Sequence, residues 1–219
     1  MVRLAEPGRL HPLEQCRPGR LCPPWVSEPG NLYASLLLID PAPLSQRATL
    51  PLAVALAVRL AICPVLPAPE TVKLKWPNDV LIRGKKTSGI LLESEDLPDG
   101  RNALVIGCGI NIQSRPENTL YPSTCLAMEG ASVSPDALFA HLLRSMAEVL
   151  STWDQGRGIA RITQLWRDAA IGLGEKITVN FTDHSISGIF SGIDDKGYLL
   201  LETGAGQPQA VAAGDVFFD

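Results

Sequence analysis

The chain has few cysteines, and they are not placed to bind a metal or to form a disulfide framework. Their number is odd, and no two of them have the spacing of a zinc site. They are Cys16, Cys22, Cys63, Cys108 and Cys125. A reducing compartment is therefore favoured over an oxidising one.

Long hydrophobic runs are also scarce. The first ten residues carry no apolar segment of the kind found in secretory signals. The most apolar run, residues 50–66, is interrupted by Arg59 and Pro64 and is too short to cross a bilayer comfortably. We therefore expect a cytoplasmic protein without a membrane partner.

Charge is limited as well. Charged residues make up 19% of the 219 positions, and the net charge is −4. Such a balance gives no electrostatic reason to bind nucleic acid. The hydrophobic content of 46% suits one large domain with a small second one.

The most informative stretch is residues 73–111. Two short apolar runs, residues 80–82 and 90–92, are joined through the turn Arg83-Gly84, and this pattern predicts an antiparallel hairpin. Trp76-Pro77 fixes an extended or turn conformation before the first strand.

Polar residues and glycines collect at the ends of these strands. Asn78 and Asp79 stand where the first strand begins, and Lys86 begins the second. Gly89 follows, where the missing side chain lets a ligand approach the backbone. A third apolar run ends in Gly107, Gly109 and Asn111. Together these groups suit an anionic ligand with a metal-bound polyphosphate.

Four motifs in this order resemble the catalytic core of biotin protein ligases of the monofunctional bacterial type. They are Trp25-Val26-Ser27 followed by Pro29-Gly30-Asn31-Leu32-Tyr33, then Lys75-Trp76-Pro77-Asn78-Asp79, then Lys86-Thr87-Ser88-Gly89-Ile90-Leu91, and finally Gly107-Cys108-Gly109-Ile110-Asn111. As a set they are specific, whereas any one alone would be weak. The resemblance implies that biotin is activated by ATP as biotinyl-5′-AMP and passed to a lysine of a biotin carboxyl carrier protein.

The resemblance also implies roles for single residues. Lys86 becomes the catalytic lysine, whose ammonium pairs with the biotin carboxylate and the α-phosphate. Lys75, Asn78 and Asp79 belong to the phosphate region, Asp79 as a ligand of Mg²⁺. The pocket for biotin and its adenylate would be formed by Arg20, Trp25, Lys86, Gly89, Ile90, Leu91, Gly107, Gly109 and Asn111. Without the resemblance, Lys86 is better interpreted as an exposed hairpin lysine beside Lys85, and Asp79 could simply cap a turn.

Residues 1–24 depart from the family pattern. The family has a glycine- and arginine-rich loop before Trp25, and only Gly19 and Arg20 keep register with it. Prolines at three nearby positions remove amide donors and stiffen this loop. The sequence also predicts no strand before Trp25. We therefore expect an atypical or truncated N-terminus and an impaired loop over the ligand.

The remaining chain predicts a two-part α/β (α+β) protein. We expect a strand over residues 31–40 and helices over 44–62, 135–152 with Ser134 as N-cap, and 159–170. After Gly174 the period changes to two, which predicts a small barrel of the SH3-like type. The catalytic domain, residues 1–172, would be a mixed sheet flanked by helices, similar to class II synthetase-like ligases, and residues 173–219 would form the barrel.

Three alternatives remain open at this stage. A lipoate or octanoate ligase would share the fold, and a catalytically impaired remnant would still bind biotin. A bifunctional repressor would need a helix-turn-helix domain that 24 Pro-rich residues cannot form. No pattern in the sequence distinguishes a monomer from a homodimer.

Overall fold

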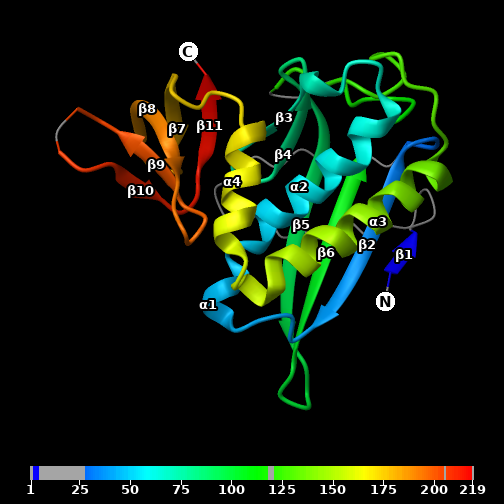
Figure 1. Cartoon of the computed structure of the whole chain (residues 1–219), viewed down its shortest axis with the longest axis horizontal. Coiled ribbons are helices and arrows are strands. Elements are labelled where there is room, and N and C mark those ends of the chain that lie inside the picture. The colour runs from blue at the N-terminus through cyan, green and yellow to red at the C-terminus, as the bar shows by residue number, and fades with distance from the viewer. Residues whose placement is uncertain (1, 5–27, 118–120, 205, 219) are drawn as a thin grey trace.

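The computed structural model describes residues 2–4, 28–117, 121–204 and 206–218. The predictions for Arg20 and Trp25, and for the loop around them, lie outside these residues. Within them the chain forms a six-stranded sheet covered by helices, followed by a smaller five-stranded sheet (Figure 1).

The larger sheet has the order β1-β2-β6-β5-β4-β3. Its strands are β1 (Val2–Leu4), β2 (Leu32–Ile39), β3 (Val72–Lys75), β4 (Asp79–Ile82), β5 (Lys85–Asp96) and β6 (Asn102–Ile110). The predicted hairpin is confirmed as β4 and β5. All ladders between these strands are antiparallel, and parallel pairing is limited to isolated bridges, so the sheet is less mixed than expected.

A strand does precede Trp25, so the prediction that none exists is wrong. Residues Val2–Leu4 form β1 and pair with residues 34–36 of β2. A segment of three residues is too short to show a period from which a strand could be predicted. It forms a strand because it pairs with β2.

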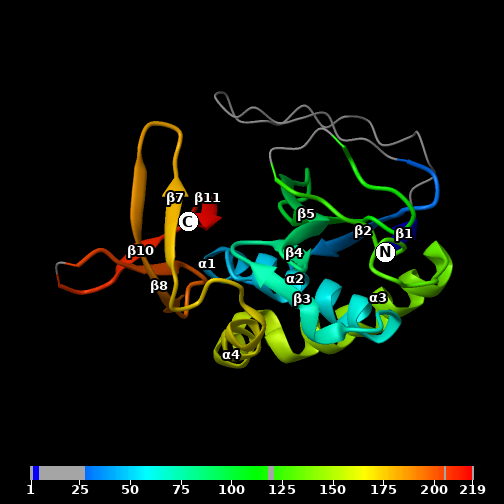
Figure 2. The same ribbon diagram turned by 90° about the horizontal axis from the view of Figure 1, so that it is seen from above.

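Helices cover one face of this sheet. They are α1 (Leu44–Arg47), α2 (Leu50–Ile62), α3 (Pro135–Trp153) and α4 (Ile159–Ala169), with short 3₁₀ turns at Cys63–Val65, Pro69–Thr71 and Asp154–Gly156. Figure 2 shows the helices gathered on one side of the strands. We call the helix-covered side the back face and the opposite side the front face.

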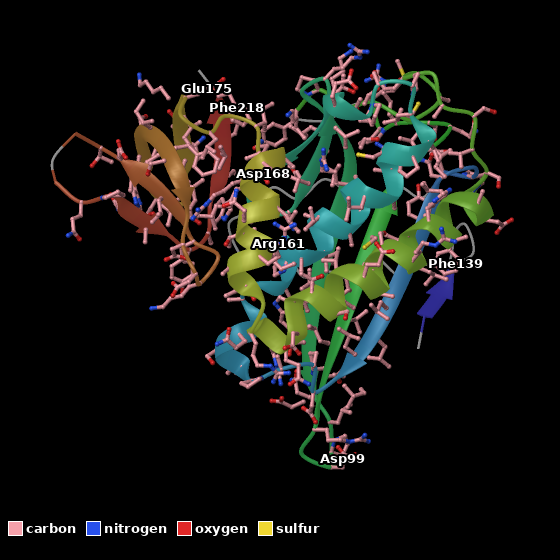
Figure 3. The ribbon with its side chains drawn as sticks, in the orientation of Figure 1. Asp99, Phe139, Arg161, Asp168, Glu175 and Phe218 are labelled. Carbon is pink, nitrogen blue, oxygen red and sulfur yellow. The ribbon has the colours of Figure 1, made fainter. Side chains whose placement is uncertain are left out.

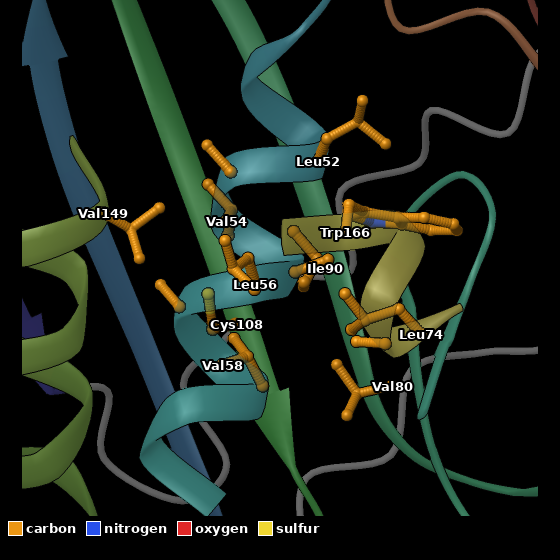
Figure 4. Close-up of a cluster of buried hydrophobic side chains, with 14 of the residues drawn as sticks. Leu52, Val54, Leu56, Val58, Leu74, Val80, Ile90, Cys108, Val149 and Trp166 are labelled. Carbon is orange, nitrogen blue, oxygen red and sulfur yellow. The ribbon is translucent and has the colours of Figure 1, made fainter. Parts of the chain in front are cut away.

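The core lies between α2 and the back face. Most of α2 is buried, and its Val54 and Val58 lie among side chains from the sheet, such as Ile90 and Cys108, as Figure 4 shows. Trp166 of α4 closes the same cluster. By length and composition the stretch Leu44–Val65 could cross a membrane. A helix buried in a protein core meets the same two criteria, and most of α2 is buried here.

The helix predicted over residues 44–62 is interrupted at residues 48 and 49. Pro51 explains the break, since proline has no amide proton and its ring clashes with the carbonyl four residues earlier. The helix α3 is confirmed together with its N-cap, because the Ser134 hydroxyl accepts the amide proton of Ala137 at 3.2 Å.

The C-terminal sheet has the order β10-β9-β8-β7-β11. Its strands are β7 (Lys176–Asn180), β8 (Ser185–Ile193), β9 (Leu199–Glu202), β10 (Gln209–Val211) and β11 (Asp215–Phe218). No ladder joins β10 to β11 among the described residues, so the predicted barrel is not closed. The predicted α/β class with a small C-terminal β unit is confirmed.

The C-terminal sheet docks on the larger one at specific contacts. The indole nitrogen of Trp76 donates to the carbonyl of Gly197 at 3.0 Å, in the turn between β8 and β9. Gly197 has φ +83°, and a Cβ there would lie 3.3 Å from Leu52. A glycine is therefore required where this turn meets the start of α2.

Candidate functional site

Strand alternation places the glycines of β6 on the front face. Leu104, Ile106 and Cys108 point into the core, so Gly107 and Gly109 face the other way. Gly109 lies directly opposite Gly89 of β5 on one side and Tyr33 of β2 on the other. Facing glycines carry no side chain above the backbone, so a ligand can reach the main chain there.

A β-bulge brings Lys86 to the same face. Ser88 pairs with Val80, which points into the core, whereas Lys86 pairs with Leu81, which does not. In a regular strand Lys86 and Ser88 would share a face. The extra residue, Thr87, shifts the register and turns Lys86 to the front.

Lys86 is paired with Asp79 on the same face as these glycines. Lys86 Nζ lies 2.6 Å from Asp79 Oδ1, with the two side chains 38% and 18% exposed. In the β3–β4 ladder Asp79 lies directly opposite Lys75. One carboxylate thus stands between two ammonium groups, and the carboxylate of Asp215 also lies near enough to Lys75 to raise its pKa.

Lys75 is enclosed by aromatic rings. Its side chain is buried, with Nζ 4.1 Å from the ring centroid of Tyr121 and 5.7 Å from that of Phe217. Burial lowers the pKa of Lys75, while the carboxylate of Asp79 acts in the opposite direction. Phe217 belongs to β11, so the C-terminal sheet forms part of this enclosure. Its neighbour Phe218 lies close to the end of α4 (Figure 3).

Asn78 holds the turn before β4 against β5. Its Nδ2 donates to the carbonyl of Ile90 at 2.7 Å. The peptide bond between Trp76 and Pro77 is cis. The amide of Asn78 is therefore anchored by its nitrogen, next to the Asp79 carboxylate.

Asn111 is fixed just beyond the end of β6. Its main-chain amide donates to the carbonyl of Thr87 at 2.9 Å, and its side-chain Nδ2 donates to the carbonyl of Thr124 at 3.0 Å. Thr124 was given no role by the sequence, because it lies outside the family motifs.

Asn31 is a second residue whose contribution sequence reasoning missed. Its Oδ1 accepts the amide protons of Ile112, Gln113 and Ser114 at 2.8, 3.0 and 3.2 Å. The chain that leaves Asn111 is thereby tied to the start of β2. Asn31 stands within one of the motifs, which was the available signal.

The structure brings together most of the predicted site residues. On or beside the front face lie Lys75, Asn78, Asp79, Lys86, Gly89, Leu91, Gly107, Gly109 and Asn111. Ile90 is the exception, since its side chain lies in the core. Any contact of Ile90 with a ligand on the front face would have to come from its backbone. Burial also raises the pKa of Cys108 to about 12, so this thiol is not a nucleophile at neutral pH.

A cavity of about 290 Å³ lies elsewhere, between α3 and the back face. Its lining is apolar and includes Leu36, Ile106, Phe139 and Met146. It offers no charged group to an anionic ligand. The front face, with its lysines and carboxylate, is therefore the candidate site.

No cluster of three or more histidine, cysteine or acidic residues suited to a metal occurs in the described part of the chain. A single carboxylate such as that of Asp79 can still help to bind Mg²⁺. Magnesium is commonly held by one or two carboxylates together with the phosphates of a nucleotide. The site therefore suits a metal that arrives with ATP.

The stretch that holds this site matches a family of biotin and lipoate protein ligases. Two family models agree with this assignment. Residues 18–111 match the biotin/lipoate A/B protein ligase family, and residues 172–219 match the biotin protein ligase C terminal domain.

Similar proteins narrow the assignment. The chain is 33% identical over 206 residues to the biotin-(acetyl-CoA-carboxylase) ligase of Paracoccus denitrificans, covering 91% of this chain and 85% of that protein. It is also 33% identical over 196 residues to the bifunctional ligase/repressor BirA of Bacillus subtilis, covering 86% of this chain but 59% of BirA. The chain belongs to the biotin protein ligase family, which confirms the resemblance seen in its motifs.

A solved structure supports the fold. The biotin protein ligase of Aquifex aeolicus, in complex with biotin and ATP, superposes with a TM-score of 0.76 at 27% identity. The match covers 92% of this chain and 83% of that one.

Proposed function

We propose that this chain is a ligase that biotinylates a carrier protein in two steps. First, the carboxylate of biotin attacks the α-phosphorus of ATP, which forms biotinyl-5′-AMP and releases pyrophosphate. Second, the ε-amine of a lysine on a biotin carboxyl carrier protein attacks the acyl carbon, which forms an amide and releases AMP. The pairing of Lys86 with Asp79 beside the facing glycines is the observation that carries this proposal.

Lys86 is the catalytic residue in this scheme. Its ammonium exchanges Asp79 for the biotin carboxylate and the α-phosphate, and neutralises charge as it moves between them. Biotin would lie against the sheet over Gly89, Gly107 and Gly109, with Leu91 and Asn111 beside it. Arg20 and Trp25 complete the pocket as the resemblance implies.

The phosphate region lies at the other end, around Lys75, Asn78 and Asp79. Asp79 would hold the Mg²⁺ that neutralises the triphosphate. Lys75 adds a positive charge behind it. Most of the protein's contribution is positioning and charge neutralisation.

The proposal also assigns a role to each of the two domains. Residues 1–172 form the catalytic domain, and residues 173–219 form the C-terminal domain. We place the protein in the cytoplasm, where a carboxylase carrier is found, as a monomer or homodimer. The repressor activity named for BirA is not extended to this chain, which spans 59% of that protein's length.

The test is biotin-dependent release of pyrophosphate from MgATP by the purified chain. We expect Lys86→Ala to slow the reaction by roughly 100- to 1000-fold, which is the effect of removing one preorganised charged contact. Lys85→Ala is the matched control, because Lys85 is the exposed neighbour of Lys86 in the same hairpin. It should react at the parent rate.

The alternatives give different results in the same assay. A lipoate or octanoate ligase would release pyrophosphate with those acids and not with biotin. An impaired remnant would bind biotin without releasing pyrophosphate. Equal rates for Lys86→Ala and Lys85→Ala would contradict the role of Lys86.

A further inference from the structure

The main chain of Lys86 is held by a segment from outside its hairpin. The amide of Lys86 donates to the carbonyl of Pro122 at 2.8 Å, and the amide of Thr124 donates to the carbonyl of Lys86 at 2.9 Å. These two bonds form the isolated parallel bridge between Lys86 and Ser123. Both backbone groups of Lys86 thus depend on where one short segment lies.

Thr124 connects this segment to the rest of the site. It is fully buried, and its carbonyl accepts the Nδ2 proton of Asn111 at 3.0 Å. Its hydroxyl donates to Glu129 Oε1 at 2.7 Å. The position of Thr124 therefore bears on Lys86 and Asn111 together.

The carboxylate of Glu129 links Thr124 to the turn before β5. Its side chain is only 10% exposed, and its second oxygen, Oε2, lies 3.3 Å from the Nε of Arg83. Arg83 stands in the turn that leads from β4 into β5, with φ +50°. One carboxylate thus bonds to the turn before Lys86 and to the segment beside it. A carboxylate held at both oxygens has little rotational freedom.

We propose that Glu129 is a positioning residue for Lys86, acting through Thr124 and the turn at Arg83. This inference rests on the proposed role of Lys86 in adenylate formation. Glu129 keeps the main chain of Lys86 at the distance from which its ammonium reaches Asp79 and the ligand. A displacement of about 1 Å at a reacting group can cost roughly 100-fold in rate, so a small relaxation here has a large effect.

The first experiment compares Glu129→Ala with Glu129→Gln in the pyrophosphate assay. We expect Glu129→Ala to lower kcat by roughly 10- to 100-fold while KM for biotin changes by less than about threefold. Glu129→Gln should recover part of kcat, because its amide oxygen still accepts the Thr124 hydroxyl proton while its amide nitrogen cannot accept a proton from Arg83. Glu148→Ala, at an exposed position of α3, is the matched control. Equal kcat for Glu129→Ala and the control would overturn the inference.

The second experiment asks whether Glu129 acts through Lys86. In the Lys86→Ala background, Glu129→Ala should cause no further loss of rate, since residues that act as a unit are not additive. A full additional loss in the double variant would overturn the inference.

The third experiment does not depend on turnover. Hydrogen exchange should show faster exchange of the Lys86 and Thr124 amides in Glu129→Ala than in the parent, with the amides of β9 unchanged. Unchanged exchange at both amides would overturn the positioning role. Because this readout needs no substrate, it separates failure of this inference from failure of the proposed function.

Discussion

The carboxylate of Asp79 lies 2.6 Å from the ammonium of Lys86, so the lysine proposed to bind biotin already has an anionic partner. Any anion that binds Lys86 must compete with Asp79. The same carboxylate is the proposed ligand of Mg²⁺. Asp79 would therefore serve either Lys86 or a Mg²⁺ bound with ATP, for which it would supply a carboxylate oxygen.

Asp79→Asn separates these two roles. We expect biotin binding without ATP to tighten by up to about fivefold, because a partly exposed ion pair is worth about 0.2–1 kcal/mol and the competition is lost. Adenylate formation should nevertheless fall, since Asn is a poorer magnesium ligand. Calorimetry with biotin and the pyrophosphate assay measure the two effects. Asp99→Asn, at the hairpin tip seen in Figure 3, is the control, and weaker biotin binding by Asp79→Asn would contradict this account.

Lys75→Met should stabilise the fold. We expect the free energy of unfolding at pH 7 to rise by about 1 kcal/mol, because Met removes an ammonium whose desolvation outweighs its attraction to Asp79 and Asp215. The gain should depend on pH. The pKa of Lys75 is lower in the folded chain than the ordinary 10.5, so the unfolded chain binds more protons between the two values and the parent gains stability as pH rises.

The advantage of Lys75→Met should therefore be largest below the lowered pKa and should shrink as pH approaches 10.5. Thermal unfolding of parent and variant across pH 7 to 10 measures it. Lys85→Met, at an exposed position, should change stability by less than about 0.5 kcal/mol. A gain that grows with pH would contradict the assignment.

Ser88→Ala should also stabilise the fold. Ser88 is 2% exposed, and its Oγ has no hydrogen-bond partner among the described residues. Removing an unsatisfied buried hydroxyl recovers about 1 kcal/mol, or roughly 2–4 °C in Tm for a chain of this size. Thermal unfolding measures the shift, with the exposed Ser191→Ala as control. A lower Tm for Ser88→Ala would mean that the hydroxyl has a partner after all.

Trp76→Phe should loosen the C-terminal sheet. The variant loses the indole donor to Gly197, which leaves that carbonyl unpaired at a cost of about 1–3 kcal/mol. We expect a lower Tm and faster proteolysis between residues 170 and 176. Gly197→Ala should have a similar effect, because its φ of +83° strains any residue with a Cβ. An unchanged cleavage pattern in both variants would show that this contact does not hold the sheets together.

The elements that sequence predicted well are those whose signals are local. The hairpin of β4 and β5 was visible because residues 80–82 and 90–92 are apolar and Arg83-Gly84 can adopt positive φ. The start of α3 was visible because Ser134 and Pro135 suit its first positions. Pro51 was an equally local signal against a continuous helix over residues 44–62, and the apolar pattern on both sides concealed it.

The finer arrangement of the site depends on contacts between distant residues. Alternation alone would place Lys86 on the back face, and only the bulge at Thr87 turns it to the front. Ser123 and Lys86 are 37 positions apart, and no sequence pattern near either residue predicts that they pair. The contact of Phe217 with Lys75 spans the two sheets. The motifs thus identified the groups present, and long-range packing determined where those groups point.

Among the described residues, the catalytic sheet carries helices on its back face alone, and this asymmetry divides the consequences of mutation into two kinds. Changes behind the sheet, in α2 or at residues such as Ile106, would reduce how much folded protein a cell accumulates while each folded molecule works normally. Changes in front, at Gly109 or Lys86, would leave abundance intact and lower the rate per molecule. Selection for heat resistance and selection for a new acid substrate could therefore proceed on opposite sides of the same strands.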